Sequence, residues 1–187
     1  MIYVDIKRSD VVINLLRFLA LQIGSEVSYT DLGDAVGVDR KTVTTYIDLL
    51  EQCFVIFRLR PFSRTLRREV GKSQKFYFCD LGVRNAILQA FAPLPLRSDV
   101  GVLWENFCIL ERRKFMANQG LRANTYFWRT YDQKEIDYIE ERDGVLTGFE
   151  CKWNPARQMR SPREFLETYP GSVVHQIDRD NYWRYLL

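Results

Sequence analysis

The first half of the chain changes from a helical to a β-type distribution of apolar side chains. From Ser9 to Gly24 apolar residues recur at the spacing of an amphipathic helix, and residues 29–53 predict a short helix, a tight turn and a longer helix capped by Asp39. Residues 54–62 and 74–80 are instead rich in aromatic and β-branched side chains, which is typical of strands. We therefore predict a helix-turn-helix followed by a two-stranded ribbon.

Three helices followed by a ribbon are typical of a winged helix, in which the second helix of the turn motif enters the major groove of DNA. The segment between the two strands would form the wing, and from Arg58 to Lys75 the chain has seven basic residues against one acidic residue. Helix and wing together supply the candidate nucleic-acid contacts, which are Arg40, Lys41, Thr42, Thr44, Thr45, Tyr46, Arg64, Arg67 and Arg68. Winged helices also dock onto proteins, and basic loops are often only solvated, so DNA and protein partners both stay open.

The second half predicts a separate domain with the order helix, three strands, helix and strand. A Pro-containing connection at residues 92–101 indicates the boundary, which gives one domain at 1–95 and a second at 96–187. The expected elements are a helix over 101–120, strands over 124–130, 134–141 and 145–153, a helix over 161–169 and a strand over 172–177. The predicted fold class is therefore α/β (α+β), with a winged-helix domain followed by an αβββαβ domain.

Three charged side chains occupy strand segments that otherwise have the composition of buried strands. With regular alternation, Ile136 and Tyr138 share one face of their strand and Asp137 faces the other, while Glu150 and Lys152 share a face of the next strand. Pairing of the two strands brings Asp137 near Glu150 and Lys152. Neighbouring carboxylates repel each other and therefore favour a divalent cation, with oxygen ligands selecting Mg²⁺ or Mn²⁺. The alternative is a cross-strand ion pair without a metal.

Composition narrows the chemistry open to such a site. The 187 residues carry a net charge of +3, a single histidine at position 175 and four cysteines without a CxxC pair. A structural zinc site is therefore disfavoured, and a Ser/His/Asp or Cys/His mechanism would have to use His175, whose apolar strand-like setting favours a structural role. Catalysis in this chain should depend on carboxylates and lysine, with Lys152 orienting or deprotonating water or stabilising charge on a phosphate.

Other patterns argue against nucleotide hydrolysis and membrane insertion. Gly71-Lys72-Ser73 looks like the end of a Walker A motif, but that motif requires glycine where the chain has Leu66, so we expect no nucleotide site. No segment approaches the roughly 18 apolar residues of a membrane helix, and the start lacks the apolar core of a signal peptide, so we predict a cytoplasmic protein. Aromatic residues make up 14% of the chain, which allows a docking or oligomer interface and leaves the oligomeric state open.

The charged positions of the second half resemble those of the PD-(D/E)xK nuclease superfamily, which has a restriction-endonuclease-like core. An acid on the helix, Glu105, precedes Asp137 on the second strand and the pair Glu150 and Lys152 on the third strand. The superfamily places a proline before the aspartate, where this chain has Ile136, and that difference removes no metal ligand. The resemblance implies Mg²⁺ or Mn²⁺ bound by Asp137 and Glu150, Lys152 as the catalytic lysine and Glu105 as an accessory acid.

A narrower resemblance extends over roughly residues 10–175. The blocks "KFYFCDLGVRNAIL", "GVLWENFCILERRK" and "FECKW" are similar to the uncharacterised C-terminal module of a bacterial and archaeal AAA+-type ATPase family. This resemblance implies an ATPase domain upstream or in trans, which the chain itself lacks. Two functions follow as expectations: a metal-dependent endonuclease that cleaves DNA, or a catalytically inactive module that binds nucleic acid or protein for the ATPase.

Overall fold

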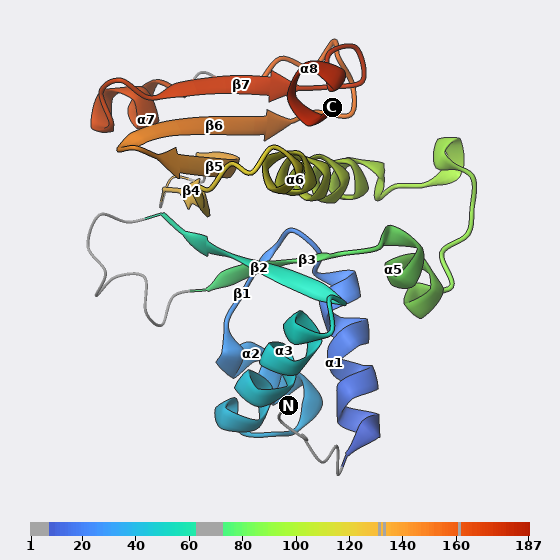
Figure 1. Cartoon of the computed structure of the whole chain (residues 1–187). Helices are drawn as coiled ribbons and strands as arrows, with labels where there is room; N and C mark the ends of the chain where they lie inside the picture. Colours follow the sequence, from blue (N-terminus) through green and yellow to red (C-terminus); the bar gives the residue numbers. More distant parts are fainter. Residues whose placement is uncertain (1–7, 63–72, 131, 133, 161) are drawn as a thin grey trace. The chain divides into compact units, whose positions relative to one another are not determined.

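The polypeptide forms two compact units with mixed α/β structure (Figure 1). The computed structural model describes residues 8–62, 73–130, 132, 134–160 and 162–187. Unit 1 comprises Met1–Arg58 and Gly71–Pro93, and unit 2 comprises Leu59–Val70 and Leu94–Leu187. The described residues contain seven α-helices, one short 3-10 helix and seven strands. Within these parts of the chain, every helix is too short or too polar to span a bilayer.

The helices of unit 1 confirm the helical pattern of the first half. They are α1 (Ser9–Leu21), α2 (Tyr29–Val36), α3 (Arg40–Gln52) and α5 (Leu81–Leu88). Local side chains define where two of them begin, because the Ser28 hydroxyl accepts a hydrogen bond from the Asp31 N–H at 3.0 Å and the Asp39 carboxylate accepts one from the Thr42 N–H at 3.0 Å. Gly37, whose φ is 70°, ends α2 in the left-handed conformation that favours glycine. The predicted short helix, turn and longer helix are therefore confirmed.

Short strands complete unit 1. The strands that follow or interrupt the helices are β1 (Glu26–Val27), β2 (Ile56–Pro61) and β3 (Gln74–Phe78), with β1 antiparallel to β3. Arg58 of β2 contacts Asp48 and Glu51 of α3, with a distance of 2.7 Å from its Nη2 to each carboxylate. This bridge ties the start of β2 to the second helix of the turn motif, and β2 continues past Arg58 into unit 2.

Unit 2 contains the elements of the second half in the order helix, three strands, helix and strand. They are η1 (Leu94–Leu96), α6 (Val100–Asn118), β4 (Asn124–Arg129), β5 (Glu135–Arg142), β6 (Val145–Cys151), α7 (Arg163–Thr168), β7 (Val173–Ile177) and α8 (Trp183–Leu186). β4, β5 and β6 pair antiparallel, β7 pairs parallel with β6, and the end of β2 pairs parallel with β4 (Figure 1). The predicted turn between β5 and β6 is confirmed, since Asp143 and Gly144 both have positive φ.

A bulge in β5 overturns the regular alternation predicted for this strand. Tyr126 pairs with Ile139 but Trp128 pairs with Ile136, so Asp137 and Tyr138 lie opposite a single residue of β4. As a result, Ile136 joins Ile139 in one core cluster instead of sharing a face with Tyr138. The prediction that Ile136 and Tyr138 face the same way was wrong, because the extra residue shifts the alternation by one position.

The two faces of the unit 2 sheet carry different helices. On one face, the buried cluster contains Trp128, Ile136, Ile139, Leu146 and Phe165, the last of which belongs to α7. On the other face, the Tyr138 ring lies 6.1 Å from the Phe149 ring, and the Arg112 guanidinium of α6 lies 4.9 Å above Phe149. β5 therefore presents side chains to α7 on one side and to α6 on the other.

Candidate functional site

Three of the four residues assigned to the predicted active site line one cavity in unit 2. This cavity has a volume of about 280 Å³ and is lined by Asp137 of β5 together with Glu150 and Lys152 at the end of β6. Trp128 and Phe165 of the apolar cluster form part of its wall. The structure thus brings the aspartate of one predicted strand together with the glutamate and the lysine of the next.

Backbone and side-chain contacts position the two carboxylates. The Oδ2 atom of Asp137 accepts a hydrogen bond from the backbone N–H of Cys151 at 2.8 Å, which links the bulge of β5 to β6. The Asp137 carboxylate lies close enough to the Glu150 carboxyl group to raise its pKa. Both residues are only 7% exposed, so the fold buries two acidic groups side by side. Such burial is costly unless a proton or a cation offsets the charge.

The electrostatics of the cavity follow from this crowding. Burial, followed by the Asp137 carboxylate, raises the pKa of Glu150 above its usual range, and the nearby ammonium of Lys152 opposes the shift only in part. Burial acts to lower the pKa of Lys152, but Asp137 and Glu150 outweigh it and the net shift is upward. The Lys152 Nζ lies 3.0 Å from the Glu150 Oε2. The cavity therefore stabilises a cation beside the two acids.

The donor set fits a hard divalent cation. Asp137 and Glu150 offer carboxylate oxygens, which Mg²⁺ and Mn²⁺ prefer, and Mg²⁺ is commonly held by one or two carboxylates plus waters and substrate phosphates. Within the described residues, no group of three or more His, Cys, Asp or Glu side chains is arranged around one point. A cation here would depend on two protein ligands and on its substrate or water for the rest.

Glu105, the fourth predicted residue, occupies a different place. It lies on α6, and the described lining of the 280 Å³ cavity does not include it. Its charge acts on Cys151, whose thiol hydrogen-bonds to Cys108 and has a pKa raised first by that bond and then by burial. Because Cys151 faces away from Glu150 and Lys152 along β6, Glu105 influences the strand from the opposite side of the sheet.

Sequence reasoning missed the basic residues at the rim of the cavity. Arg157 and Arg160 line it after β6, and Lys134 lines it before β5. Lys134 forms an ion pair with Glu164 of α7 at 2.7 Å, whereas Arg157 and Arg160 are exposed. Arg157 and Arg160 lie in the segment "NPARQMR" at 154–160. This segment has no periodic pattern, so the sequence does not indicate which site its positive charges adjoin. These side chains add positive potential next to the two acids.

The predicted nucleic-acid contacts of the first half of the chain have mixed outcomes. Arg40 and Lys41 are exposed at the start of α3, and the Thr44 hydroxyl donates to the Arg40 carbonyl at 2.9 Å. Tyr46 is 7% exposed and belongs to the core, so its assignment as a contact residue was wrong: it lies on the same helix face as Val43 and Ile47. The wing residues Arg64, Arg67 and Arg68 fall in residues 63–72, which lie outside the described residues.

The chain is similar to two families whose functions are not known. Residues 3–94 match a domain of unknown function, DUF8612. Residues 100–184 match DUF4143, a second domain of unknown function. The second match covers the helix, strands and cavity of unit 2 that carry the candidate site.

Curated relatives are themselves uncharacterised. The chain is 28% identical over 163 residues to the uncharacterized proteins Mb2031c of Mycobacterium bovis and Rv2008c of Mycobacterium tuberculosis, with 84% of the chain covered. It is 29% identical over 83 residues, or 44% of the chain, to the uncharacterized protein MJ1637 of Methanocaldococcus jannaschii, of which the match covers 17%. The chain spans about a third of the length of the mycobacterial relatives, at 36%. No solved structure matches the chain.

Proposed function

We propose that unit 2 is a metal-dependent phosphodiesterase of the PD-(D/E)xK nuclease type that acts on DNA. One observation carries this proposal: the buried carboxyl groups of Asp137 and Glu150 share a cavity with Lys152, whose Nζ lies 3.0 Å from the Glu150 Oε2. A lysine and a glutamate can form an ion pair without a second buried acid, whereas two neighbouring carboxylates form a stronger site for a divalent cation. Crowded, buried ionisable groups in a cavity are typical of functional sites.

Each residue of the cavity has a chemical role in this proposal. Asp137 and Glu150 would hold Mg²⁺ or Mn²⁺, which neutralises phosphate charge and lowers the pKa of a bound water. The neighbouring acids raise the pKa of Lys152, so its ammonium stays protonated at neutral pH and donates to a phosphate oxygen rather than acting as a base. Arg157 and Arg160 at the rim bind the flanking phosphates of the strand.

We further propose that the chain serves an ATPase. The DUF4143 domain that matches residues 100–184 occurs in C-terminal regions associated with AAA-type ATPases, and the mycobacterial relatives are longer proteins of which the match covers 36%. Unit 1 would then supply the helices of a winged helix, which holds DNA through Arg40 and Lys41, exposed at the start of α3, and through the basic segment at 63–72 that follows β2. ATP hydrolysis elsewhere in such a protein would control access of DNA to the cavity.

Cleavage of DNA by the purified chain tests the enzymatic proposal. With Mg²⁺ or Mn²⁺ present, duplex and single-stranded DNA should be cut, and excess EDTA should stop the reaction. Asp137→Asn should abolish cleavage because it removes a carboxylate charge from the metal site, while the matched variant Asp180→Asn, at an exposed position, should cut like the wild type. Intact DNA under all these conditions, or equal cleavage by Asp137→Asn, would remove the proposed function.

The second candidate is an inactive binding module that serves the ATPase. The ion pair of 3.0 Å between Lys152 and Glu150 favours it, because a lysine that neutralises the glutamate can replace the metal. This reading predicts salt-dependent DNA binding without cleavage, and the binding should weaken when Arg40 and Lys41 are both changed to Gln. DNA affinity that does not respond to that double substitution would exclude contact through α3.

A further inference from the structure

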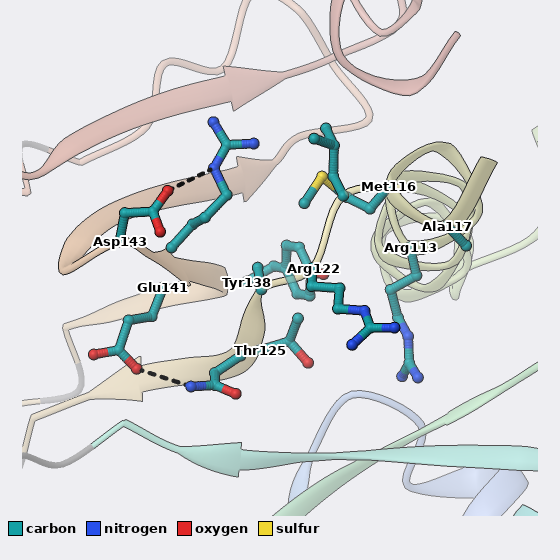
Figure 2. A pocket seen from close by; sticks show the side chains of 12 residues that line it. Arg113, Met116, Ala117, Arg122, Thr125, Tyr138, Glu141 and Asp143 are labelled. Atoms are coloured by element: carbon teal, nitrogen blue, oxygen red, sulfur yellow. Dashed lines mark hydrogen bonds and ion pairs between the residues drawn. The ribbon is translucent and has the colours of Figure 1, made fainter. Parts of the chain in front are cut away.

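Unit 2 contains a second, larger cavity on the α6 side of its sheet. It has a volume of about 580 Å³, within the range of roughly 300–1,000 Å³ that is typical of small-molecule sites. The last turns of α6, the start of β4 and the end of β5 enclose it (Figure 2). It shares no described lining residue with the cavity of Asp137 and Glu150. The two cavities are therefore separate places for ligands.

A buried hydroxyl group lines this second cavity without a protein partner. Tyr138 is 1% exposed, and its hydroxyl oxygen forms no hydrogen bond within the described residues. A tyrosine hydroxyl can both donate and accept a hydrogen bond at neutral pH. Native proteins leave few buried polar groups unpaired, and each exception calls for a partner from outside the chain. A ligand with an acceptor oxygen would supply that partner.

The charges around Tyr138 are separated across the cavity. Figure 2 shows Arg113 and Arg122 on the side of α6, with Glu141 and Asp143 on the opposite side. The acids at that end already have contacts, since Glu141 accepts a hydrogen bond from Asn124 at 3.4 Å and Asp143 lies 4.0 Å from the Nε of Arg142. The cavity thus has two arginines and an unused donor toward α6, and two acids at the other end, where Arg142 also lines the cavity beside Asp143.

We propose that this cavity binds the phosphate group of a small, nucleotide-sized ligand. Arg113 and Arg122 neutralise the phosphate, and the Tyr138 hydroxyl donates to one of its oxygens. Glu141 and Asp143 accept hydrogen bonds from donors at the other end of the ligand, such as sugar hydroxyls or an amino group of a base. Met116 and Ala117 of α6 supply apolar surface on the arginine side of the cavity (Figure 2).

The mixed charges favour a small ligand over a nucleic-acid strand. A polyanion that passes through the cavity would bring phosphates against Glu141 and Asp143, and like charges at short range repel. A single phosphate avoids that repulsion when it lies at the Arg113 and Arg122 end. The Tyr138 hydroxyl oxygen is almost fully covered, so the ligand reaches it after a small displacement of flexible side chains that line the same cavity, such as Met116.

Titration of the full chain with dAMP, followed by calorimetry, tests this proposal through Tyr138. Tyr138→Phe removes only the hydroxyl and keeps the ring, so the variant should fold and should bind dAMP about tenfold more weakly, which corresponds to one hydrogen bond to a charged group. Tyr182→Phe is the matched control, because Tyr182 lies outside the cavity, and it should bind like the wild type. Equal affinity of Tyr138→Phe and the wild type would overturn the proposal.

Arg122 provides a second, independent test with other probes. Arg122→Gln should weaken dAMP binding about tenfold, while Arg163→Gln, at an exposed position on α7, should leave it unchanged. Inorganic phosphate should compete with dAMP, since both present the same group to the arginines. The proposal fails if dAMP gives no saturable signal, or if only a single-stranded oligonucleotide binds and Arg122→Gln weakens it, because that result would assign the cavity to a strand.

Discussion

Asp137 and Tyr138 are consecutive residues of β5, and both are buried. The polar atoms of Asp137 have protein neighbours, whereas the hydroxyl of Tyr138 has none among the described residues. The Asp137 carboxylate accepts the Cys151 N–H at 2.8 Å and raises the pKa of the nearby Glu150 carboxyl group, whereas the Tyr138 hydroxyl has no partner among the described residues. Because of the bulge, Asp137 lines the cavity of about 280 Å³ and Tyr138 lines the cavity of about 580 Å³. One cavity holds two crowded, buried carboxyl groups that a cation would neutralise, while the other holds an unused donor that an anion would accept from.

Glu140, two residues after Tyr138 in β5, is a buried acid whose charge is neutralised within the protein. It is 6% exposed, and its two carboxylate oxygens accept hydrogen bonds from Arg112 at 2.7 and 2.8 Å. This pairing leaves no charge or donor for a ligand to satisfy. Comparison of the three neighbours therefore separates a structural acid, Glu140, from the two residues whose surroundings are incomplete without a ligand.

The largest expected effect concerns the role of Lys152 in the first cavity. Lys152→Ala should lower the rate of DNA cleavage by roughly 100-fold or more, because it removes the charged donor that stabilises the phosphate in the transition state. Lys114→Ala is the matched control, since Lys114 is an exposed lysine of α6, and its cleavage rate should equal that of the wild type. Wild-type cleavage by Lys152→Ala in single-turnover assays would contradict the assignment.

A large stability effect is expected from the structural acid. Arg112→Ala should lower the free energy of unfolding by about 3 kcal/mol, because Glu140 would be buried without its partner. Urea denaturation of the purified variant measures this value. Arg163→Ala removes an exposed pair with Glu167 and should cost under about 1 kcal/mol. Similar losses in both variants would show that Glu140 is less dependent on its partner than its burial implies.

Glu150→Gln should raise stability in the absence of metal by roughly 1 kcal/mol at pH 8, since it removes a buried charge beside Asp137. Because the pKa of Glu150 is raised in the folded state, the wild type loses stability as the pH rises above the ordinary value of a glutamate, and the variant lacks this loss. Denaturation from pH 4 to 8 in EDTA measures the difference. Parallel stability curves for the two proteins would contradict the buried-charge account.

The smallest expected effect concerns the unpaired hydroxyl. Without ligand, Tyr138→Phe should raise the free energy of unfolding by roughly 0.5–1 kcal/mol, because it deletes a buried donor that has no partner among the described residues. Tyr182→Phe should not show this gain. Thermal melts under the same conditions compare the two variants. A loss of stability in Tyr138→Phe would mean that the hydroxyl already has a partner.

Sequence patterns predicted the elements of both units because local forces determine them. The apolar spacing of α1 and α3, the cap at Asp39 and the turn at Asp143 and Gly144 depend on residues close in the chain, and the structure confirms them. The same patterns also placed Asp137, Glu150 and Lys152 near one another, since strand pairing through a tight hairpin leaves little freedom of register.

Features that depend on packing between distant segments were not predictable in the same way. The bulge at Asp137 and Tyr138 contains no glycine or proline, so the sequence does not indicate it. Regular alternation therefore predicted that Tyr138 shares a face with Ile136, which is wrong. Tyr46 looked like an exposed helix residue but fills the core of unit 1. Arg157 joins the rim of the first cavity through a segment without periodic pattern, which only the path of the chain after β6 determines.

The most direct test of the first cavity is calorimetric titration of the purified chain with Mn²⁺, without DNA. The account predicts a single saturable site in the wild type that is lost in both Asp137→Asn and Glu150→Gln and retained in Asp180→Asn. Lys152→Ala should retain the site, because the lysine is not a metal ligand in this account. If the wild type does not bind Mn²⁺, or if Asp137→Asn binds it with equal affinity, then Asp137 and Glu150 do not form a metal site.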